Sequence, residues 1–227
     1  MLRGNAFYMT MHILLVENNK LSQPDSLVAN LEAQDYHVTV AHTAKVAAQK
    51  TEALWPNLVI FNTANFNVKL SKLQHTINQC NLNIPYVVVG EANNQMIADN
   101  TFFSAPGDSD QLKDTIAKAT AKQKDRFIRL PDLVIDCRQR QVLRGNQQFH
   151  LTPKEFRLLQ LLVEYKDRDL SRRAIMKEVW ETDYMGDTRT LDVHIRWVRE
   201  KIEDDPNHPR RLITIRGVGY RLITQTG

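Results

Sequence analysis

The first half of the chain alternates short apolar runs with helix-like segments, and this alternation restricts the fold more than any other feature. The apolar runs, which have the length and composition of buried strands, span residues 12–16, 37–40, 58–61, 84–89 and 102–103. The predicted helices span residues 21–34, 44–54, 69–80 and 108–124. The alternation predicts a doubly wound α/β fold, a five-stranded parallel sheet covered by helices on both faces.

Polar or small residues follow four of the predicted strands. They are Glu17, Asn18, Asn62, Gly90 and Ala105. In an open parallel sheet the carboxyl ends of the strands meet at one edge, where ligands and functional residues collect. We therefore expect these five residues to form a pocket at that edge.

This order of elements resembles a response-regulator receiver domain over residues 11–124. In that family two acids after the first strand hold Mg²⁺, and an aspartate at the end of the third strand accepts phosphate. A hydroxyl residue ends the fourth strand, and a lysine precedes a proline after the fifth. The matching positions here are Glu17, Asn18, Asn62, Gly90 and Ala105, so four of the five functional groups are absent.

These replacements remove the chemistry that phosphorylation needs. The amide of Asn62 is not a nucleophilic carboxylate, Glu17 alone is a poor ligand set for Mg²⁺, and Ala105 has no cation to pair with a phosphoryl group. The resemblance thus implies a degenerate receiver that acts without aspartyl phosphorylation, and we expect no metal and no cofactor. Two interpretations of the amides stay open: Asn18 and Asn62 cap strands and bond to loop backbone, or they bind a small ligand.

Arginine is distributed very unevenly along the chain. Of 17 arginines, 16 lie after residue 124, although the formal net charge of the whole chain is only +4. The planar guanidinium group suits phosphates and base edges. The change in composition indicates two domains with different partners, joined by a linker at residues 125–131.

The second half carries strong signals for helix starts and for a hairpin. Thr152, Pro153 and Glu155 combine an N-cap, a proline at the first helical position and a capping box. A small antiparallel sheet is expected before this helix, at residues 133–136, 141–144 and 149–151. Near the end of the chain, Gly217 and Gly219 predict a hairpin with Arg216 close to its tip.

An amphipathic helix is expected at about residues 188–203. Its apolar stripe consists of Leu191, Ile195, Val198 and Ile202, and its arginines lie off this stripe. A basic helix that follows a helix and a turn fits a reader of the DNA major groove. An ordinary solvated helix face is the alternative.

Three motifs in this half resemble the winged helix-turn-helix domain of OmpR/PhoB-type transcription regulators. They are LTPKEF at residues 151–156, TLDVHIR at 190–196 and IRGVGYR at 215–221. The resemblance implies a winged-helix domain at residues 132–227, and a regulator that binds specific sequences in double-stranded DNA and is not an enzyme. The DNA-binding residues that it implies are Arg189, Val193, His194, Arg196, Trp197, Arg199, Thr214 and Arg216.

Trp197 departs from the family pattern, because relatives often have a basic residue at this position. An indole cannot form the bidentate guanine contact that arginine forms. Trp197 either contacts the sugar-phosphate chain or thymine methyl groups, or packs against the loop or the preceding helix.

The resemblance also suggests protein partners. In relatives the loop before the recognition helix meets RNA polymerase, which makes Tyr184 and Met185 candidate contacts here. Relatives also dimerise through an acid-base network, but the matching positions are Asn100, Thr101 and Thr115. A homodimer, at least on DNA, therefore stays open.

The cysteines and the hydropathy of the chain bear on metal binding and on cellular location. Cys80 and Cys137 are the only cysteines and are not clustered with histidine, which argues against a zinc site. No apolar segment approaches the ~18 residues of a membrane span, and residues 1–10 lack a leader-like apolar stretch. We therefore expect a cytoplasmic protein without a membrane partner.

Two alternative functions remain. One is a signalling regulator that is switched by a ligand or by residual phosphotransfer at the receiver pocket. The other is a C-terminal domain that binds only protein. Binding to DNA would be distinguished by its steep dependence on salt.

Overall fold

The computed structural model describes residues 11–18, 26–63, 70–80, 82–90, 100–123, 125–183 and 189–224. Residue contacts divide the chain into two compact units, Met1–Phe127 and Ile128–Gly227. Each unit is described by itself. Among the described residues, no helix has the length and hydrophobicity that crossing a membrane requires.

The described part of the N-terminal unit contains five parallel strands in the spatial order β2-β1-β3-β4-β5. Their bounds are β1 His12–Val16, β2 His37–Ala41, β3 Leu58–Asn62, β4 Tyr86–Val89 and β5 Thr101–Ser104. The described helices are α1 Val28–Glu32, α2 Ala44–Leu54, α3 Leu70–Asn78 and α4 Ser109–Thr120. The predicted α/β fold is confirmed.

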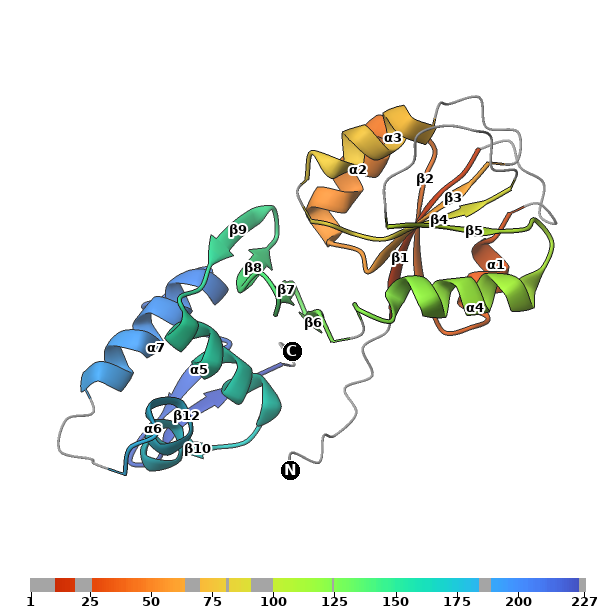
Figure 1. Cartoon of the computed structure of the whole chain (residues 1–227). Coiled ribbons are helices and arrows are strands. Elements are labelled where there is room, and N and C mark those ends of the chain that lie inside the picture. The colour runs from red at the N-terminus through yellow and green to blue at the C-terminus, as the bar shows by residue number, and fades with distance from the viewer. Residues whose placement is uncertain are drawn as a thin grey trace. The chain divides into compact units, whose positions relative to one another are not determined.

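Helices cover both faces of this sheet, with α2 and α3 on one face and α1 and α4 on the other (Figure 1). On the α1–α4 face, Ile13 and Leu15 of β1 pack in one buried cluster with Leu31 of α1 and Ile116 of α4. All five residues of β1 are buried, as are those of β3. Burial on two faces explains why these strands are continuous apolar runs rather than alternating ones.

The C-terminal part of the chain begins with a sheet in the order β6-β7-β8-β9, in which β8 pairs antiparallel with β7 and with β9. Its strands are β6 Phe127–Leu130, β7 Leu133–Asp136, β8 Gln141–Arg144 and β9 Gln147–His150. Strand β6 lies within the segment 125–131, for which the composition predicts a linker, and its residues Phe127 and Ile128 are buried. The domain bounds 11–124 and 132–227 remain predictions.

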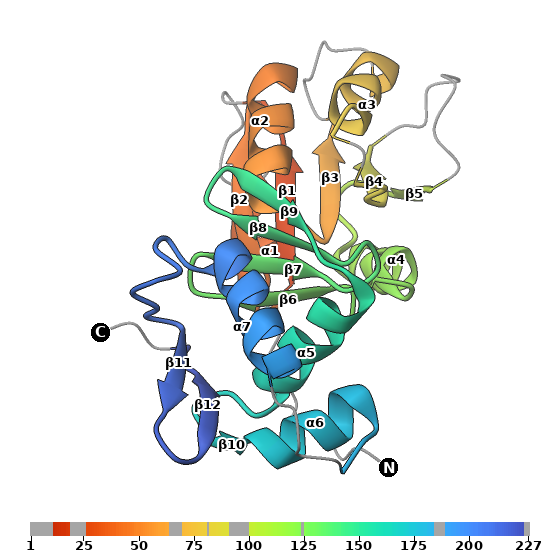
Figure 2. The same ribbon diagram turned by 90° about the vertical axis from the view of Figure 1, so that its left-hand side faces the viewer.

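Three helices and a second small sheet follow. They are α5 Pro153–Glu164, β10 Leu170–Ser171, α6 Arg172–Trp180, α7 Arg189–Ile202, β11 Leu212–Ile215 and β12 Gly219–Leu222. Helix α7 packs beside α5 and against β8 (Figure 2). Strands β11 and β12 form the predicted antiparallel hairpin, and β10 pairs with β12. This arrangement is the predicted winged helix-turn-helix.

Local signals account for the helix starts and for the packing of α7. The Thr152 backbone N–H donates to the Glu155 carboxylate at 2.7 Å, and the Glu155 backbone N–H donates to the Thr152 hydroxyl, which confirms the capping box. The predicted stripe of α7 is also confirmed, because its members are all buried: Leu191, Ile195, Val198 and Ile202.

Candidate nucleic-acid interface and sheet-edge pocket

The carboxylate of Glu17 lies at the carboxyl edge of the parallel sheet and accepts three hydrogen bonds. The donors are the Ser26 hydroxyl at 2.8 Å, the Leu27 backbone N–H at 3.4 Å and the Asn62 side-chain amide at 3.2 Å. Glu17 is only 4% exposed and Asn62 only 3%. A buried carboxylate needs such donors to replace the water it has lost.

These contacts do not fit the Mg²⁺ site that receiver domains of the family have at this edge. Both carboxylate oxygens of Glu17 accept hydrogen bonds, and Asn62 directs its N–H₂ group, which cannot ligate a cation, toward Glu17. A hard cation requires oxygen ligands aimed at a common point. The structure therefore places Asn62 as a donor to Glu17, a role beyond the strand cap considered above.

The other pocket residues follow β4 and β5 and have different neighbours. Gly90 has a φ of 132°, and a side chain at this position would clash with the Thr63 hydroxyl, which donates to the Val89 carbonyl at 3.0 Å. Ala105 is exposed, and its backbone N–H donates to the Gln111 side chain at 2.6 Å. Asn18 is half-buried beside Glu17 in the chain. Sequence reasoning missed Ser26 and Thr63, because neither belongs to a recognisable motif.

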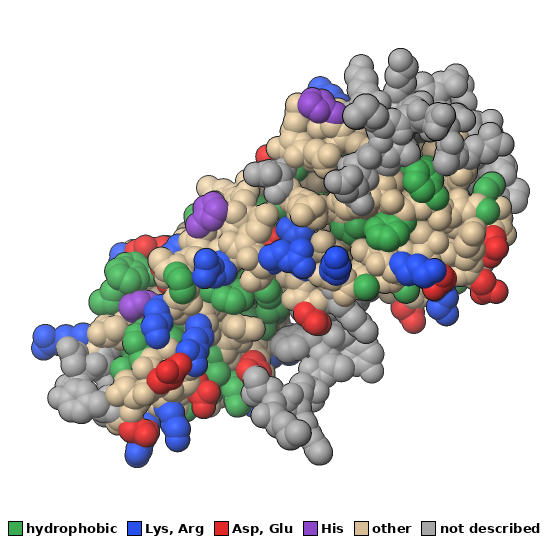
Figure 3. Space-filling model, in the orientation of Figure 1, with side chains coloured by type: hydrophobic (Ala, Val, Ile, Leu, Met, Phe, Trp, Pro, Cys, Tyr) green, Lys and Arg blue, Asp and Glu red, His purple; other side chains and the backbone are tan. Residues whose placement is uncertain are grey.

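The C-terminal unit carries many Lys and Arg side chains on its surface, mixed with acidic and apolar ones (Figure 3). On α7, Arg189 and Arg196 are exposed. Val193 and Trp197 are also exposed, each by 42%. This face of α7 thus offers both cationic and apolar groups.

The two central arginines of α7 make different contacts. The Arg196 guanidinium pairs with Glu200 at 3.3 Å and donates to the Asn207 side chain at 3.3 Å. The Arg199 guanidinium turns toward the hairpin and donates to the Leu212 carbonyl and the Thr214 hydroxyl, both at 2.9 Å. Burial lowers the pKa of Arg199, and nearby Tyr220 and acidic groups oppose this effect. Arg199 therefore ties the helix to β11.

His194 stands between two tryptophan rings. Its ring centroid lies 5.0 Å from that of Trp180, the last residue of α6, and 4.9 Å from that of Trp197, both in edge-on geometry. Its Nδ1–H donates to the Thr190 carbonyl at 2.8 Å. Trp197 thus contacts His194 of its own helix, which in turn contacts Trp180 of α6, and Trp197 still keeps an exposed surface.

A polar network that sequence reasoning did not identify holds the start of α7. The Arg172 guanidinium donates to the Asp192 carboxylate at 2.6 Å and to the Tyr220 hydroxyl at 3.0 Å, and the Tyr220 hydroxyl also donates to Asp192. Burial and the hydrogen bond with Asp192 raise the pKa of Tyr220 to about 12. The network joins α6, α7 and β12.

The hairpin presents its tip to solvent. Arg216 and Val218 are exposed there on either side of Gly217, whose φ of 73° is a conformation that glycine adopts without strain. Gly219 lies so close to β10 that a side chain would clash with the Leu170 carbonyl. Close backbone approach explains why the second glycine of the IRGVGYR motif is needed.

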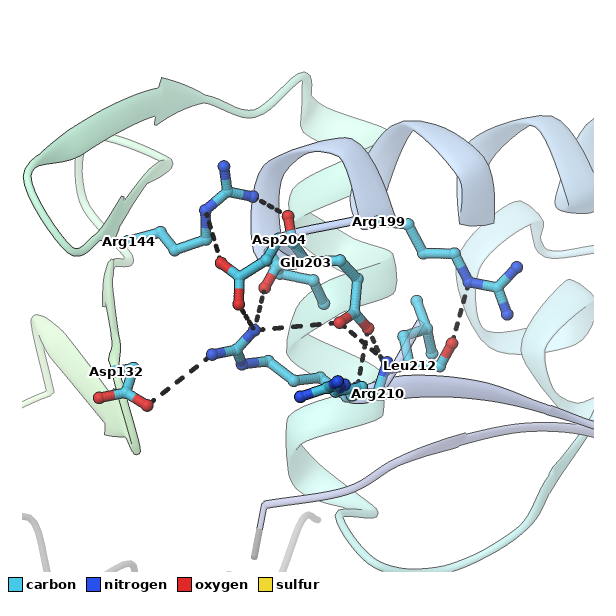
Figure 4. Close-up of polar contacts among 9 residues, drawn as sticks. Asp132, Arg144, Arg199, Glu203, Asp204, Arg210 and Leu212 are labelled. Atoms are coloured by element: carbon cyan, nitrogen blue, oxygen red, sulfur yellow. Dashed lines mark hydrogen bonds and ion pairs between the residues drawn. The ribbon is translucent and has the colours of Figure 1, made fainter. Parts of the chain in front are cut away.

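Glu203, directly after α7, closes the loop that leads to β11. Its carboxylate accepts the backbone N–H groups of Arg210 at 3.1 Å, Arg211 at 2.9 Å and Leu212 at 2.6 Å (Figure 4). Arg144 and Arg211 pair with the neighbouring Asp204. The end of α7 and the start of β11 are therefore fixed to each other. No motif in the sequence points to this role of Glu203.

Two candidate residues of the loop before α7 have no described position. Tyr184 and Met185, the predicted contacts for RNA polymerase, lie outside the described residues.

Comparison with known proteins agrees with the motifs. A family described as "Transcriptional regulatory protein, C terminal" matches residues 146–222. An uncharacterised transcriptional regulatory protein of Bacillus subtilis, YkoG, is 30% identical over 229 residues, which cover 93% of this chain and 97% of that protein.

The alkaline phosphatase synthesis transcriptional regulatory protein SphR of Synechococcus elongatus is 49% identical over 87 residues, or 38% of this chain. That match spans only 33% of the length of SphR. Among solved structures, the OmpR/PhoB homologue DrrB of Thermotoga maritima is 22% identical over 95% of this chain and all of its own, with a TM-score of 0.40. The DNA-binding domain of Klebsiella pneumoniae RstA, solved in complex with its RstA box, is 30% identical over 44% of this chain and 99% of its own, with a TM-score of 0.41.

Proposed function

The chain belongs to the OmpR/PhoB-type response regulators with a C-terminal DNA-binding domain, and we propose on that premise that it regulates transcription at specific DNA sequences without aspartyl phosphorylation. One observation carries the second part of the proposal. The Asn62 amide donates to the buried Glu17 carboxylate, where a phosphorylated receiver needs a nucleophilic carboxylate and a metal.

In the proposed complex, α7 enters the major groove and the hairpin lies on the flanking backbone. Arg189 and Arg196 supply guanidinium groups for phosphates or base edges, together with His194, Val193 and Trp197. The exposed Arg216 at the hairpin tip reaches a phosphate or the minor groove. The Arg199 guanidinium donates a hydrogen bond to the Thr214 hydroxyl, so the role of these two residues is to hold α7 and the hairpin in register.

The degenerate receiver domain, over residues 11–124, then serves as a scaffold rather than as a phosphorylation switch. Asn18, Asn62, Gly90 and Ala105 lack the functional groups that the family has at these positions, and neutral donors already occupy both carboxylate oxygens of Glu17. We extend the proposal to a cytoplasmic protein that forms homodimers at least on DNA. RNA polymerase is a further candidate partner through Tyr184 and Met185.

Selection of bound duplexes from a random pool tests the proposed DNA binding. The purified full chain should enrich one sequence class, and its affinity should fall steeply as salt rises, because phosphate contacts release counterions. An unenriched pool, or an affinity that is independent of salt, would contradict the proposal. In that case the C-terminal domain would be a protein-binding module.

A further inference from the structure

Two exposed apolar side chains lie one helical turn apart on α7. Val193 and Trp197 each keep 42% of their surface exposed, whereas the stripe that faces the core is fully buried. Residues at i and i+4 are neighbours on a helix surface. The pair therefore forms one apolar patch in the middle of the helix that the proposed function places in the major groove.

The indole of this patch is held in place. Its edge-on contact with His194, whose ring also contacts Trp180, joins three rings across α6 and α7. The hydrogen bond from His194 to the Thr190 carbonyl fixes the central ring in turn. A side chain that is already ordered loses little conformational entropy when it binds.

The nearest guanidinium groups are engaged within the protein. Arg199 donates to the Leu212 carbonyl and to Thr214, and Arg196 pairs with Glu200 and Asn207. A bidentate contact with guanine would require either arginine to give up these partners. The apolar patch, in contrast, can meet a base edge without rearrangement.

We propose that Val193 and Trp197 read the C5-methyl groups of thymines, so that this chain prefers T·A pairs at the positions opposite the patch. Among the four standard base pairs, only those with thymine present a methyl group in the major groove. The inference rests on the proposed DNA binding and deepens it by naming the bases that are recognised.

Replacing thymine by deoxyuridine tests this directly, because the substitution removes only the methyl group. Each thymine of the selected duplex is exchanged singly, and the dissociation constant for the full chain is measured by fluorescence anisotropy at fixed salt. At one or more positions, uracil should weaken binding about three- to tenfold, the loss expected for one methyl group withdrawn from apolar contact.

Variants assign the effect to the patch. Each of the two residues should account for the preference at the thymine that it contacts. The variant Trp197→Ala, or Val193→Ala, should therefore bind equally well to duplexes with thymine and with uracil at that base pair. Val218→Ala is the matched control, since Val218 is 43% exposed but lies at the hairpin tip, away from the major groove in the proposed complex. This control should keep the preference of the wild-type chain for thymine. Circular dichroism and urea unfolding confirm that each variant is folded.

The outcomes separate the inference from the proposed function. Binding that is unchanged by uracil at every position would overturn thymine reading while leaving DNA binding intact. A second outcome concerns Trp197 alone. If Trp197→Ala weakens binding to thymine and uracil duplexes by the same factor at every position, the variant keeps the wild-type preference for thymine. The indole then contacts the sugar-phosphate chain, and its assigned role is wrong. Failure to enrich any duplex would overturn the proposed function and, with it, this inference.

Discussion

The side-chain amide of Asn62 donates a hydrogen bond to the carboxylate of Glu17, with 3.2 Å between Nδ2 and Oε2. Asn62 is the last residue of β3, Glu17 directly follows the neighbouring strand β1, and both residues are buried. An aspartate at position 62 would place two carboxylates at this distance with little water between them. The amide of Asn62 therefore avoids a second buried negative charge beside Glu17.

The substitution Asn62→Asp should therefore destabilise the N-terminal unit at neutral pH. We expect a loss of roughly 1–3 kcal/mol in the free energy of unfolding, since a buried hydrogen bond becomes a like-charge contact. Burial and the like charge both raise the pKa of the introduced carboxyl group. The loss should be small near pH 4, where this group is protonated, and should grow as the pH rises to 7.

Urea unfolding of the full chain measures this effect, with hydrogen exchange of the β1 and β3 amides assigning the transition to the N-terminal unit. Asn18→Asp is the matched control, because Asn18 is only half-buried and should cost less. Adding Glu17→Gln to Asn62→Asp should recover part of the loss. Equal stability of Asn62→Asp and wild type at pH 7 would show that the hydrogen bond is unimportant.

Arg196→Ala should weaken binding to the selected duplex by roughly 1–3 kcal/mol if Arg196 reads a base edge. If it contacts only a phosphate, affinity should fall alike for all sequences and the salt dependence should become shallower. The matched control is Arg140→Ala, since Arg140 is an exposed arginine of the β7–β8 turn, outside α7 and the hairpin. Electrophoretic mobility shifts at several salt concentrations separate these cases, and wild-type binding by Arg196→Ala would contradict the docking of α7.

Tyr220→Phe should change how stability depends on alkaline pH. The pKa of Tyr220 is raised to about 12, whereas an unfolded tyrosine ionises at about 10. The contribution of the neutral hydroxyl is therefore complete below pH 10 and is lost as the pH rises from 10 to about 12. The wild-type chain should lose stability in this interval more steeply than Tyr220→Phe, which should itself be less stable at pH 8 by about 1 kcal/mol. Parallel slopes in urea unfolding would contradict the Asp192–Tyr220 hydrogen bond.

Substituting Tyr184 and Met185 by alanine should lower transcription from a bound promoter. The reason is that these two residues are proposed to contact RNA polymerase and not DNA, so DNA affinity should not change. Transcription in vitro and a mobility shift with the same protein preparation give the two values. An equal decrease in both would instead indicate that the loop affects folding or DNA binding.

The sequence predicts much of the fold because strands that are buried on both faces of a sheet consist of continuous apolar residues. Strands β1 and β3 coincide within one residue with the apolar runs at 12–16 and 58–61, and the capping box at Thr152 marks the exact start of α5. Strand β6, within the segment 125–131, left no such pattern, because Phe127 and Ile128 are its only two consecutive apolar residues.

Contacts within the candidate sites depend on side-chain direction, which periodicity does not give. Arg199 lies off the apolar stripe and therefore looks like a DNA contact, yet its guanidinium turns toward Leu212 and Thr214. Glu203 looks like an ordinary solvated acid but is buried and accepts three backbone N–H groups. The direction of the Asn62 amide likewise follows from the position of Glu17, which directly follows the neighbouring strand β1.

The most direct test of phosphorylation-independent regulation is to treat the wild-type chain with acetyl phosphate and Mg²⁺, then measure its intact mass and its affinity for the selected duplex. An established response regulator that retains its aspartate serves as a positive control for the phosphodonor. We predict no gain of a phosphoryl group and the same dissociation constant before and after treatment. A rapid, Mg²⁺-dependent gain of phosphate mass, together with a changed affinity for DNA, would contradict the account.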